Sequence, residues 1–313
     1  MNISTAFARH WGALAFILLY VAGLVVLAST GFEVGDALVA LAIFGVIFPL
    51  LAWVTTRRAV RLPAADRCSG IDLVLLAACV VALSIYLVGG PQWIDSHFPG
   101  ISPRGHELIN LARKLTVFVV LPFLLFRAVS GYRWRDYGVS SAALRELGRS
   151  HLLVVLTLSA LFLLFNYFAG RAAAPIRAGT FTAGQLALAL PLAFAWLLLE
   201  VGLVEEFFFR GVVQSRLSAW FRSETNGVAL MALVFGLAHA PGFIFRRAGV
   251  VEGLGQNPSA LQAMAYAIVI LAPTGLVFGI VWARTRNLLA AIVIHAAVDL
   301  LPHTSKFIEA WKV

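Results

Sequence analysis

Long apolar runs recur along almost the whole chain and constrain its fold more than any other feature. Most are roughly 18–20 residues long, the length of α-helix that spans a hydrocarbon core about 30 Å thick. Of the 313 residues, 61% are hydrophobic and 12% are charged, whereas a soluble domain has about 45–50% and about 25%. A transmembrane β-barrel would alternate apolar and polar residues, and these runs do not. The sequence therefore predicts an all-α fold, a polytopic transmembrane helical bundle of eight to nine helices.

The expected helices coincide with the apolar runs, whose ends we place to within several residues. One run, 184–219, is too long for a single span, so we expect it to continue past the membrane surface. Two later runs are short, which suits helices shielded from lipid by their neighbours. In chain order the runs are 11–29, 37–55, 71–88, 108–126, 152–169, 184–219, 228–240, 261–283 and 288–302.

Basic residues collect in one set of the connections between these runs. The net charge is +9, but arginines at helix ends are the topology signal of a membrane protein, so we exclude nucleic acid as a partner. The positive-inside rule assigns these connections and the N-terminus to the cytoplasm. We expect a multi-pass integral protein of a bacterial inner or plasma membrane. The basic connections hold Arg9, Arg57, Arg58, Arg61, Arg67, Arg127, Arg133, Arg135, Arg145, Arg149, Arg216, Arg222, Arg284 and Arg286; the opposite ones hold Arg104, Arg171, Arg177, Arg246 and Arg247.

One cluster of charge lies inside an apolar run, in the segment Glu205-Glu206-Phe-Phe-Phe-Arg210. Charged side chains at membrane depth are costly, so they indicate a functional site by default. Glu206 and Arg210 are four residues apart, where side chains meet on a helix, and a buried guanidinium needs such a partner. Glu205 points about 100° away around the helix. We therefore assign Glu206 and Arg210 a supporting role and Glu205 the chemistry.

Two histidines and an aspartate in later runs reach a depth similar to that of Glu205. A turn is expected about 18 residues after Glu205 and about 16 before His239. Because an α-helix rises about 1.5 Å per residue, antiparallel helices on either side of this turn place both side chains at similar depth. His295 and, one turn further, Asp299 climb from a second turn on the same side. The spacing predicts that these four residues converge on one buried pocket.

Such a pocket suits peptide hydrolysis by water. A carboxylate in a low-dielectric environment becomes a better proton acceptor, which suits Glu205 to the role of general base. Water between Glu205 and His239 can lose a proton and attack a peptide carbonyl, while His295 donates a hydrogen bond to the developing oxyanion. No Ser or Cys nucleophile accompanies these residues, so direct attack by water is the economical scheme.

The polar residues form three motifs in order: Glu205-Glu206-x-x-x-Arg210, Phe235-x-x-x-His239 and His295-x-x-x-Asp299. This set resembles the motifs of the CPBP family, the CAAX-processing and bacteriocin-processing intramembrane endopeptidases, also called the Abi family. The resemblance implies an all-helical glutamic-type protease in which Glu205 and His239 activate water, and His295 with residue 299 stabilises the oxyanion. The eukaryotic prenyl-protein proteases have Asn at this last position. An ionised Asp299 cannot donate a hydrogen bond, so a protonated Asp299, an orienting role toward His295 and another ligand all stay open.

The resemblance divides the chain into three parts. Residues 1–183 form N-terminal transmembrane helices outside the recognised motifs, and residues 184–302 form a CPBP-like catalytic helical core. Residues 303–313 are expected to be a C-terminal tail, with His303 exposed. As partners we expect a peptide or membrane-protein substrate and the lipid bilayer. A prenylated CAAX tail, a bacteriocin leader and a surface-protein precursor are all compatible substrates.

Other functions use the same residues differently. Glu205, His239 and His295 are an alternative set of zinc ligands, because catalytic zinc usually takes three protein ligands and water. The only cysteines, Cys68 and Cys79, add no Cys-based site. The family resemblance favours a mechanism without metal, so we expect no cofactor. A proton- or ion-coupled transporter would use the same side chains as a relay, but the sequence has no internal repeat of the kind that many transporters show. The third alternative is a non-catalytic scaffold or immunity protein of the same family.

Overall fold

The computed structural model describes residues 3–245, 254 and 257–313, and their regular secondary structure is entirely helical. Within this part of the chain, eight helices are long and apolar enough to cross a membrane. A ninth crossing results if the bent pair Trp134–Leu147 and Leu152–Phe168 is counted as one span. The predicted fold class, an all-α transmembrane bundle of eight to nine helices, is therefore confirmed.

Several crossings are composite, because π-helical turns interrupt an otherwise continuous α-helix; the label η marks these turns and also two 3-10 helices, η3 and η4, between crossings. Short elements between crossings are η3 (Trp134–Tyr137), α7 (Ser141–Leu147), η4 (Arg171–Ala173) and α9 (Ala174–Arg177). The crossings are α1 (Ile3–Ser29); α2, η1 and α3 (Val34–Ala40, Leu41–Ile47, Phe48–Thr55); α4 (Gly70–His97); α5, η2 and α6 (Pro103–Leu115, Thr116–Val120, Leu121–Ser130); α8 (Leu152–Phe168); α10, η5, α11, η6 and α12 (Ala183–Leu197, Leu198–Leu203, Val204–Glu206, Phe207–Gln214, Ser215–Phe221); α13 and α14 (Glu224–Leu237, Ala240–Phe245); α15, η7 and α16 (Ala260–Tyr266, Ala267–Leu271, Ala272–Thr285); and α17 (Leu288–Trp311).

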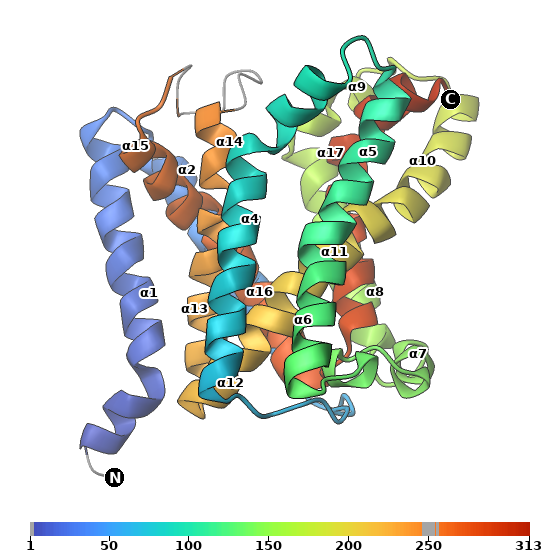
Figure 1. The fold of residues 1–313 in the computed structure, drawn as a ribbon. Helices are drawn as coiled ribbons and strands as arrows, with labels where there is room; N and C mark the ends of the chain where they lie inside the picture. The colour runs from blue at the N-terminus through green and yellow to red at the C-terminus, as the bar shows by residue number, and fades with distance from the viewer. Residues whose placement is uncertain (1–2, 246–253, 255–256) are drawn as a thin grey trace.

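The crossings alternate between two opposite faces of the bundle (Figure 1). α5 and α10 begin, and α17 ends, at the upper face in this view, which we call the C-terminal face. The connections that follow α3, α6, α12 and α16 lie at the lower face. We call this lower face the arginine face because its connections and helix ends hold Arg57, Arg58, Arg61, Arg67, Arg127, Arg133, Arg135, Arg145, Arg149, Arg222, Arg284 and Arg286.

Two tight turns at the arginine face set the depth of the later helices. α12 is closed by Arg222 at φ 48° and α16 by Arg286 at φ 50°, both in the left-handed region, a common way for a helix to end. The side-chain oxygens of Ser223 and Asn287 then each accept a backbone N–H and cap α13 and α17. Because these turns are so short, the residue spacing along the chain translates directly into depth in the bundle.

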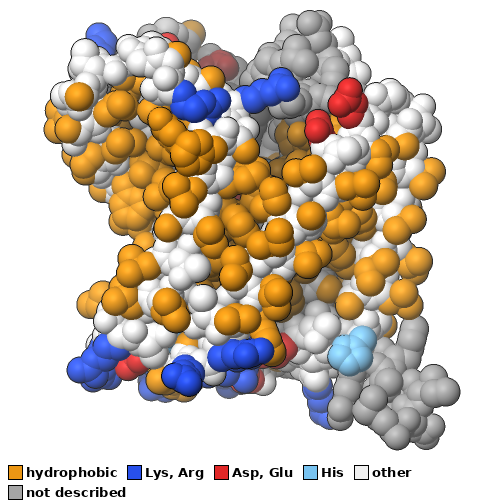
Figure 2. Space-filling model, turned by 180° about the vertical axis from the view of Figure 1, so that it is seen from behind, with side chains coloured by type: hydrophobic (Ala, Val, Ile, Leu, Met, Phe, Trp, Pro, Cys, Tyr) orange, Lys and Arg blue, Asp and Glu red, His pale blue; other side chains and the backbone are white. Residues whose placement is uncertain are grey.

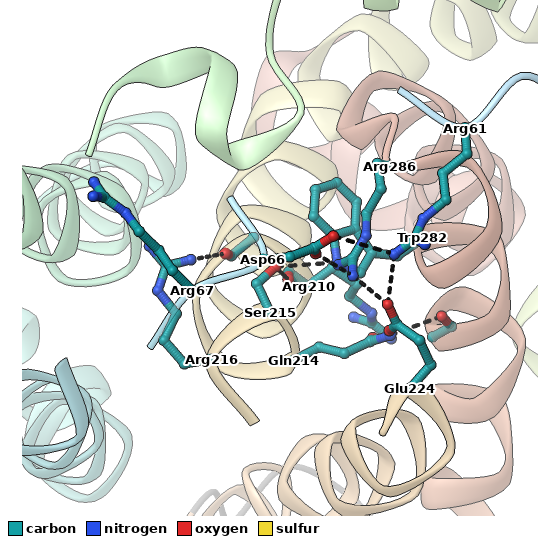
Figure 3. A network of polar contacts seen from close by, with 12 residues as sticks. Arg61, Asp66, Arg67, Arg210, Gln214, Ser215, Arg216, Glu224, Trp282 and Arg286 are labelled. Carbon is teal, nitrogen blue, oxygen red and sulfur yellow. Dashed lines mark hydrogen bonds and ion pairs between the residues drawn. The ribbon is translucent and has the colours of Figure 1, made fainter. Parts of the chain in front are cut away.

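Ion pairs hold the turn that contains Arg286. Its guanidinium is buried and donates to Asp66 at 2.8 Å and also to Glu224. Glu224 in turn accepts from Arg61 at 2.6 Å, and Figure 3 shows these side chains converging from separate segments. The connection after α3, the start of α13 and the start of α17 are therefore fixed to one another at the arginine face.

α13 and α16 approach each other closely through small residues. A Cβ atom on Gly275 would lie 2.9 Å from the Cα of Ala232, and one on Gly236 would lie 2.9 Å from the Cβ of Ala272. Lipid tails are as apolar as leucine, so helices associate in a membrane largely through this kind of close packing. The contact supports the site, because His239 lies two residues beyond the last residue of α13, Leu237.

Two helices are longer than the sequence predicted. The run 288–302 and the expected tail 303–313 form one helix, α17, which passes Pro302 and reaches Trp311. The run 228–240 likewise belongs to a crossing that continues through α14. The predicted short crossings are therefore wrong, because polar residues end an apolar run without ending the helix when they face protein instead of lipid.

Replacing Gly275 by Ala is expected to destabilise the bundle, because its new methyl group meets backbone and overpacking costs about 1–3 kcal/mol. Gly89→Ala is the matched control, since its Cβ would meet nothing within 4 Å and Ala favours a helix. Thermal unfolding in detergent should show a lower Tm for Gly275→Ala only. Equal Tm values would contradict the close approach of α13 and α16.

Candidate active site

The two adjacent glutamates lie where the helical hydrogen-bond pattern changes. α11 is a single short α-helical turn that contains Glu205 and Glu206, with π-helical η5 before it and η6 after it. Mid-helix π turns occur frequently at functional sites. Here they rotate successive side chains away from their α-helical directions, so the positions of charged groups in this crossing do not follow the 3.6-residue period alone.

Glu206 and Arg210 form the predicted ion pair. Arg210 Nη1 lies 2.9 Å from Glu206 Oε1, and neither side chain is exposed. The guanidinium also lies 4.7 Å from the ring centre of Phe235 and 4.8 Å from that of Phe278. Ring faces attract a cation most strongly where it is desolvated, so the rings and the carboxylate together accommodate a charge that would be costly alone.

Glu206 also holds His295, the first residue of the third motif. His295 Nδ1 lies 2.6 Å from Glu206 Oε1, and because a carboxylate accepts, Nδ1 carries the proton. The other ring nitrogen, Nε2, lies 3.9 Å from Glu205 Oε2 and 3.7 Å from Asp299 Oδ2. These separations exceed a direct hydrogen bond. Glu206 therefore turns Nε2 toward the carboxylates of Glu205 and Asp299.

His239 is oriented by its own helix. Its Nδ1 lies 2.8 Å from the carbonyl oxygen of Phe235, which can only accept, so Nδ1 donates and Nε2 keeps its lone pair. His239 lines the same cavity as Glu205 and Asp299. Among the described residues, no direct hydrogen bond or ion pair joins Glu205 to His239. A molecule in the cavity would have to connect them.

The cavity has a volume of about 650 Å³, which lies within the range of ligand pockets, about 300–1,000 Å³. Glu205, His239 and Asp299 lie in its wall, whereas Glu206 and Arg210 do not. His295 stands behind the wall in contact with both groups of residues. The structure thus brings together all four residues that the spacing predicted, with the two supporting residues one layer deeper.

Lys114 and Glu200 also line this cavity beside Glu205, although neither belongs to the three motifs. Lys114 Nζ donates to the side chain of Glu200 and to its backbone carbonyl, the latter at 3.3 Å. In a regular α-helix Glu200 would point about 140° away from Glu205. The π turns of η5 bring both residues to the cavity instead. Both residues could have been identified from the sequence, since a charged residue inside an apolar run indicates a functional site.

A second ion pair lies at the rim of the cavity. Lys306 Nζ lies 2.8 Å from Glu107 Oε1, and Lys306 is 64% exposed. His303, expected to be exposed, is half-buried; it lies in the cavity wall, and its Nδ1 donates to the carbonyl of Asp299 at 3.0 Å. The final turns of α17, which the sequence separated as a tail, therefore belong to the cavity.

The zinc alternative requires Glu205, His239 and His295 to share one set of ligands. Across residues 3–245, 254 and 257–313, no group of three or more His, Cys, Asp or Glu side chains is placed to hold a metal ion. Of the proposed ligands, Glu205 and His295 approach each other, but His239 joins neither in a common ligand set. We therefore derive no step of the reaction through a metal.

Loss of Arg210 is expected to destabilise the fold, because it leaves the fully buried Glu206 carboxylate without its cation. Removing one partner of a buried ion pair typically costs about 3–5 kcal/mol. Arg210→Ala should therefore lower the Tm in detergent substantially, whereas Arg58→Ala, at an exposed position, should change it little. A wild-type Tm for Arg210→Ala would show that the pair does not support the fold.

The pair of Lys114 and Glu200 allows a similar test with an internal control. Lys114→Met leaves a buried Glu200 charge uncompensated and should cost about 3–5 kcal/mol of unfolding free energy. Lys306→Met removes an exposed pair that contributes about 0–1 kcal/mol. The double variant Lys114→Met, Glu200→Leu should recover much of the loss, because neither charge remains. A different order of unfolding free energies among these three variants would contradict the interpretation that Lys114 and Glu200 form a buried pair in which each charge depends on the other.

Comparison with known proteins supports the assignment of this part of the chain. Residues 185–301 match a family model described as type II CAAX prenyl endopeptidase, Rce1-like. No curated protein matches the chain, and no solved structure matches it either. The matched segment contains Glu205, His239, His295 and Asp299 and agrees with the resemblance inferred from the three motifs. Residues 185–301 of this multi-pass membrane protein are thus similar to the Rce1-like CAAX prenyl endopeptidases, in line with the CPBP resemblance of the three motifs.

Proposed function

We propose that the chain hydrolyses a peptide bond with a water molecule that Glu205 and His239 activate inside the bundle. The observation that supports this most is the different environment of two neighbouring glutamates. Glu206 is sequestered by Arg210 and His295, whereas Glu205 lines the cavity. Among the described residues, no lysine or arginine forms an ion pair with Glu205. Its carboxylate is therefore available to accept a proton.

In the first step, water between Glu205 and His239 gives its proton to Glu205 while its oxygen bonds to the peptide carbonyl carbon. His239 Nε2, whose lone pair is free, accepts the second hydrogen bond of this water and fixes its direction. The carbonyl oxygen becomes an oxyanion. The tetrahedral intermediate then collapses, the carbon–nitrogen bond breaks, and the proton held by Glu205 passes to the leaving amine.

We assign oxyanion stabilisation to His295 and the orientation of His295 to its carboxylate neighbours. Since Nδ1 donates to Glu206, Nε2 can donate to an oxyanion only while the ring is an imidazolium. Negative charge on Glu206 and Asp299, at 2.6 and 3.7 Å from the two ring nitrogens, supports that cation. Asp299 thus acts on His295, which is a role that an ionised carboxylate can fill in place of an asparagine amide.

The closed end of the cavity favours hydrolysis over transport. A relay or carrier needs a polar route to both sides of the membrane. Beyond Glu205, toward the arginine face, the same crossing carries Phe207, Phe208 and Arg210, which are fully buried and do not line the cavity. Glu205, His239 and Asp299 therefore serve one chamber and not a continuous path.

Glu205→Gln is expected to abolish proteolysis while the protein still inserts and folds, because the amide cannot accept the proton. The loss should be at least about 100-fold, the lower end of what general acid–base catalysis contributes. Comparative proteomics of cells that carry wild type or Glu205→Gln should find precursors that stay uncut in the variant. Glu309→Gln, an exposed carboxylate on α17, is the control. Normal processing in Glu205→Gln would remove Glu205 from catalysis.

A further inference from the structure

The cavity becomes more exposed along α17 toward the C-terminal face. The exposed fraction of the side chain is 6% for His295, 22% for Asp299 and 64% for Lys306. The wall at this end comes from the first turns of α5, with Glu107, and the last turn of α17, with Trp311. Both elements lie at the top of Figure 1. The chamber that holds Glu205 therefore opens toward the C-terminal face.

The opposite end of the chamber is closed by packed side chains. Phe207, Phe208, Arg210 and Gln214 are fully buried between the chamber and the arginine face. Gln214 also donates to the carbonyl oxygen of Gly279 at 2.9 Å, which links η6 to α16. A polypeptide that approached from the arginine face would have to separate these contacts before it reached Glu205.

The distribution of basic residues orients these two faces. Figure 2 shows Lys and Arg side chains along the lower edge of the apolar band, at the arginine face. The C-terminal face has fewer basic residues. Those among the described residues are Arg104, Arg171, Arg177, Lys306 and Lys312. Arg246 and Arg247 lie outside the described residues, and counting them with this face would not change the comparison. Connections rich in lysine and arginine stay in the cytoplasm. The arginine face is thus the cytoplasmic candidate and the C-terminal face the external one.

We propose that the active-site chamber opens to the non-cytoplasmic side of the membrane, and that its substrates are extracytoplasmic segments of exported or membrane-anchored polypeptides. The substrate part of this inference rests on the proposed endopeptidase function. A prenylated carboxyl-terminal tail on a cytoplasmic protein would face the closed end of the chamber. Such a tail would have to enter from the cytoplasmic side, whereas the chamber opens on the opposite side of the membrane.

The depth of the site adds a requirement on the substrate. Asp299 and Trp311 are twelve positions apart on α17, which corresponds to about 18 Å along the helix. An extended chain covers about 3.3–3.6 Å per residue, so roughly five residues must pass the rim before a peptide bond reaches Glu205. A cavity of about 650 Å³ is too small for a folded domain. The substrate must therefore enter the chamber as an unfolded, extended segment.

Labelling of single cysteines tests which face is external, independently of catalysis. Burial raises the pKa of the Cys68 thiol to about 11, and Cys79 is buried in the core. Cys68→Ser gives a background without a thiol at the arginine face, into which Lys306→Cys and Arg58→Cys are introduced separately. Both positions are exposed, one at the chamber rim and one at the arginine face.

Intact cells are treated with a membrane-impermeant maleimide, with permeabilised cells as the reference for full labelling. The proposal expects Lys306→Cys to react fully in intact cells and Arg58→Cys to react only after permeabilisation. The opposite pattern would place the chamber mouth in the cytoplasm and overturn the proposal. Equal labelling of Lys306→Cys and Arg58→Cys in intact cells would also contradict it, because the two faces could not then lie on opposite sides.

Mapping of the lost cleavages tests the substrate class. Peptides with new N-termini are compared between cells that carry wild type and cells that carry Glu205→Gln, and each lost cleavage site is placed in its parent protein. Sites within extracytoplasmic segments support the proposal, whereas sites within cytoplasmic tails overturn the substrate class even if the labelling holds. If no cleavage is lost in Glu205→Gln, both the endopeptidase function and the substrate class are contradicted. The labelling experiment still shows on which side of the membrane the chamber opens.

Discussion

The Glu206 carboxylate is the interaction on which the site depends. One oxygen accepts from Arg210 at 2.9 Å and from His295 at 2.6 Å, in an environment without exposed surface. A buried carboxylate is tolerated only when its charge is compensated. Because Arg210 and His295 come from two different crossings, their shared contact with this oxygen fixes the ring of His295 relative to the helix that carries Glu205. The other oxygen of Glu206 is buried and has no hydrogen-bond partner among the described residues. Structural stability and active-site geometry thus share one interaction.

The change to π-helical geometry around α11 explains how one crossing serves both purposes. A regular α-helix would distribute Glu200, Glu205 and Glu206 over widely separated directions. With η5 and η6 on either side, Glu200 and Glu205 line the cavity, and Glu206 points into the protein. Lys114 contacts both the carboxylate and the carbonyl of Glu200. It therefore holds the irregular segment to α5 at the level of the reaction.

Much of this arrangement could be predicted because depth in a membrane is nearly proportional to position along a helix. The tight turns at Arg222 and Arg286 preserve that relation, so Glu205, His239, His295 and Asp299 could be brought together from spacing alone. The i, i+4 relation likewise indicated the pair of Glu206 and Arg210.

The direction in which each side chain points around its helix was harder to predict, because no local sequence pattern indicates a π turn. The pair of Lys114 and Glu200 could not be predicted from local spacing, because it joins crossings that are distant in sequence. The end of α17 beyond Pro302 lines the cavity, and hydropathy alone does not show which residues line a cavity. The roles of the individual residues in catalysis stay predictions.

The pairing of charges also indicates where water enters the bundle. Lys114 pairs with Glu200, Arg210 with Glu206 and Lys306 with Glu107. Among the described residues, Glu205 and Asp299 form ion-pair contacts only with His295, at 3.9 and 3.7 Å. Carboxylates that are not fully paired need solvent, and a chamber of about 650 Å³ with these carboxylates in its wall has room for several water molecules. A hydrolase inside a membrane must obtain its second reactant from outside the lipid. The chamber that opens at the C-terminal face meets this need, and the same opening that admits water to Glu205 also determines the side from which a substrate can approach.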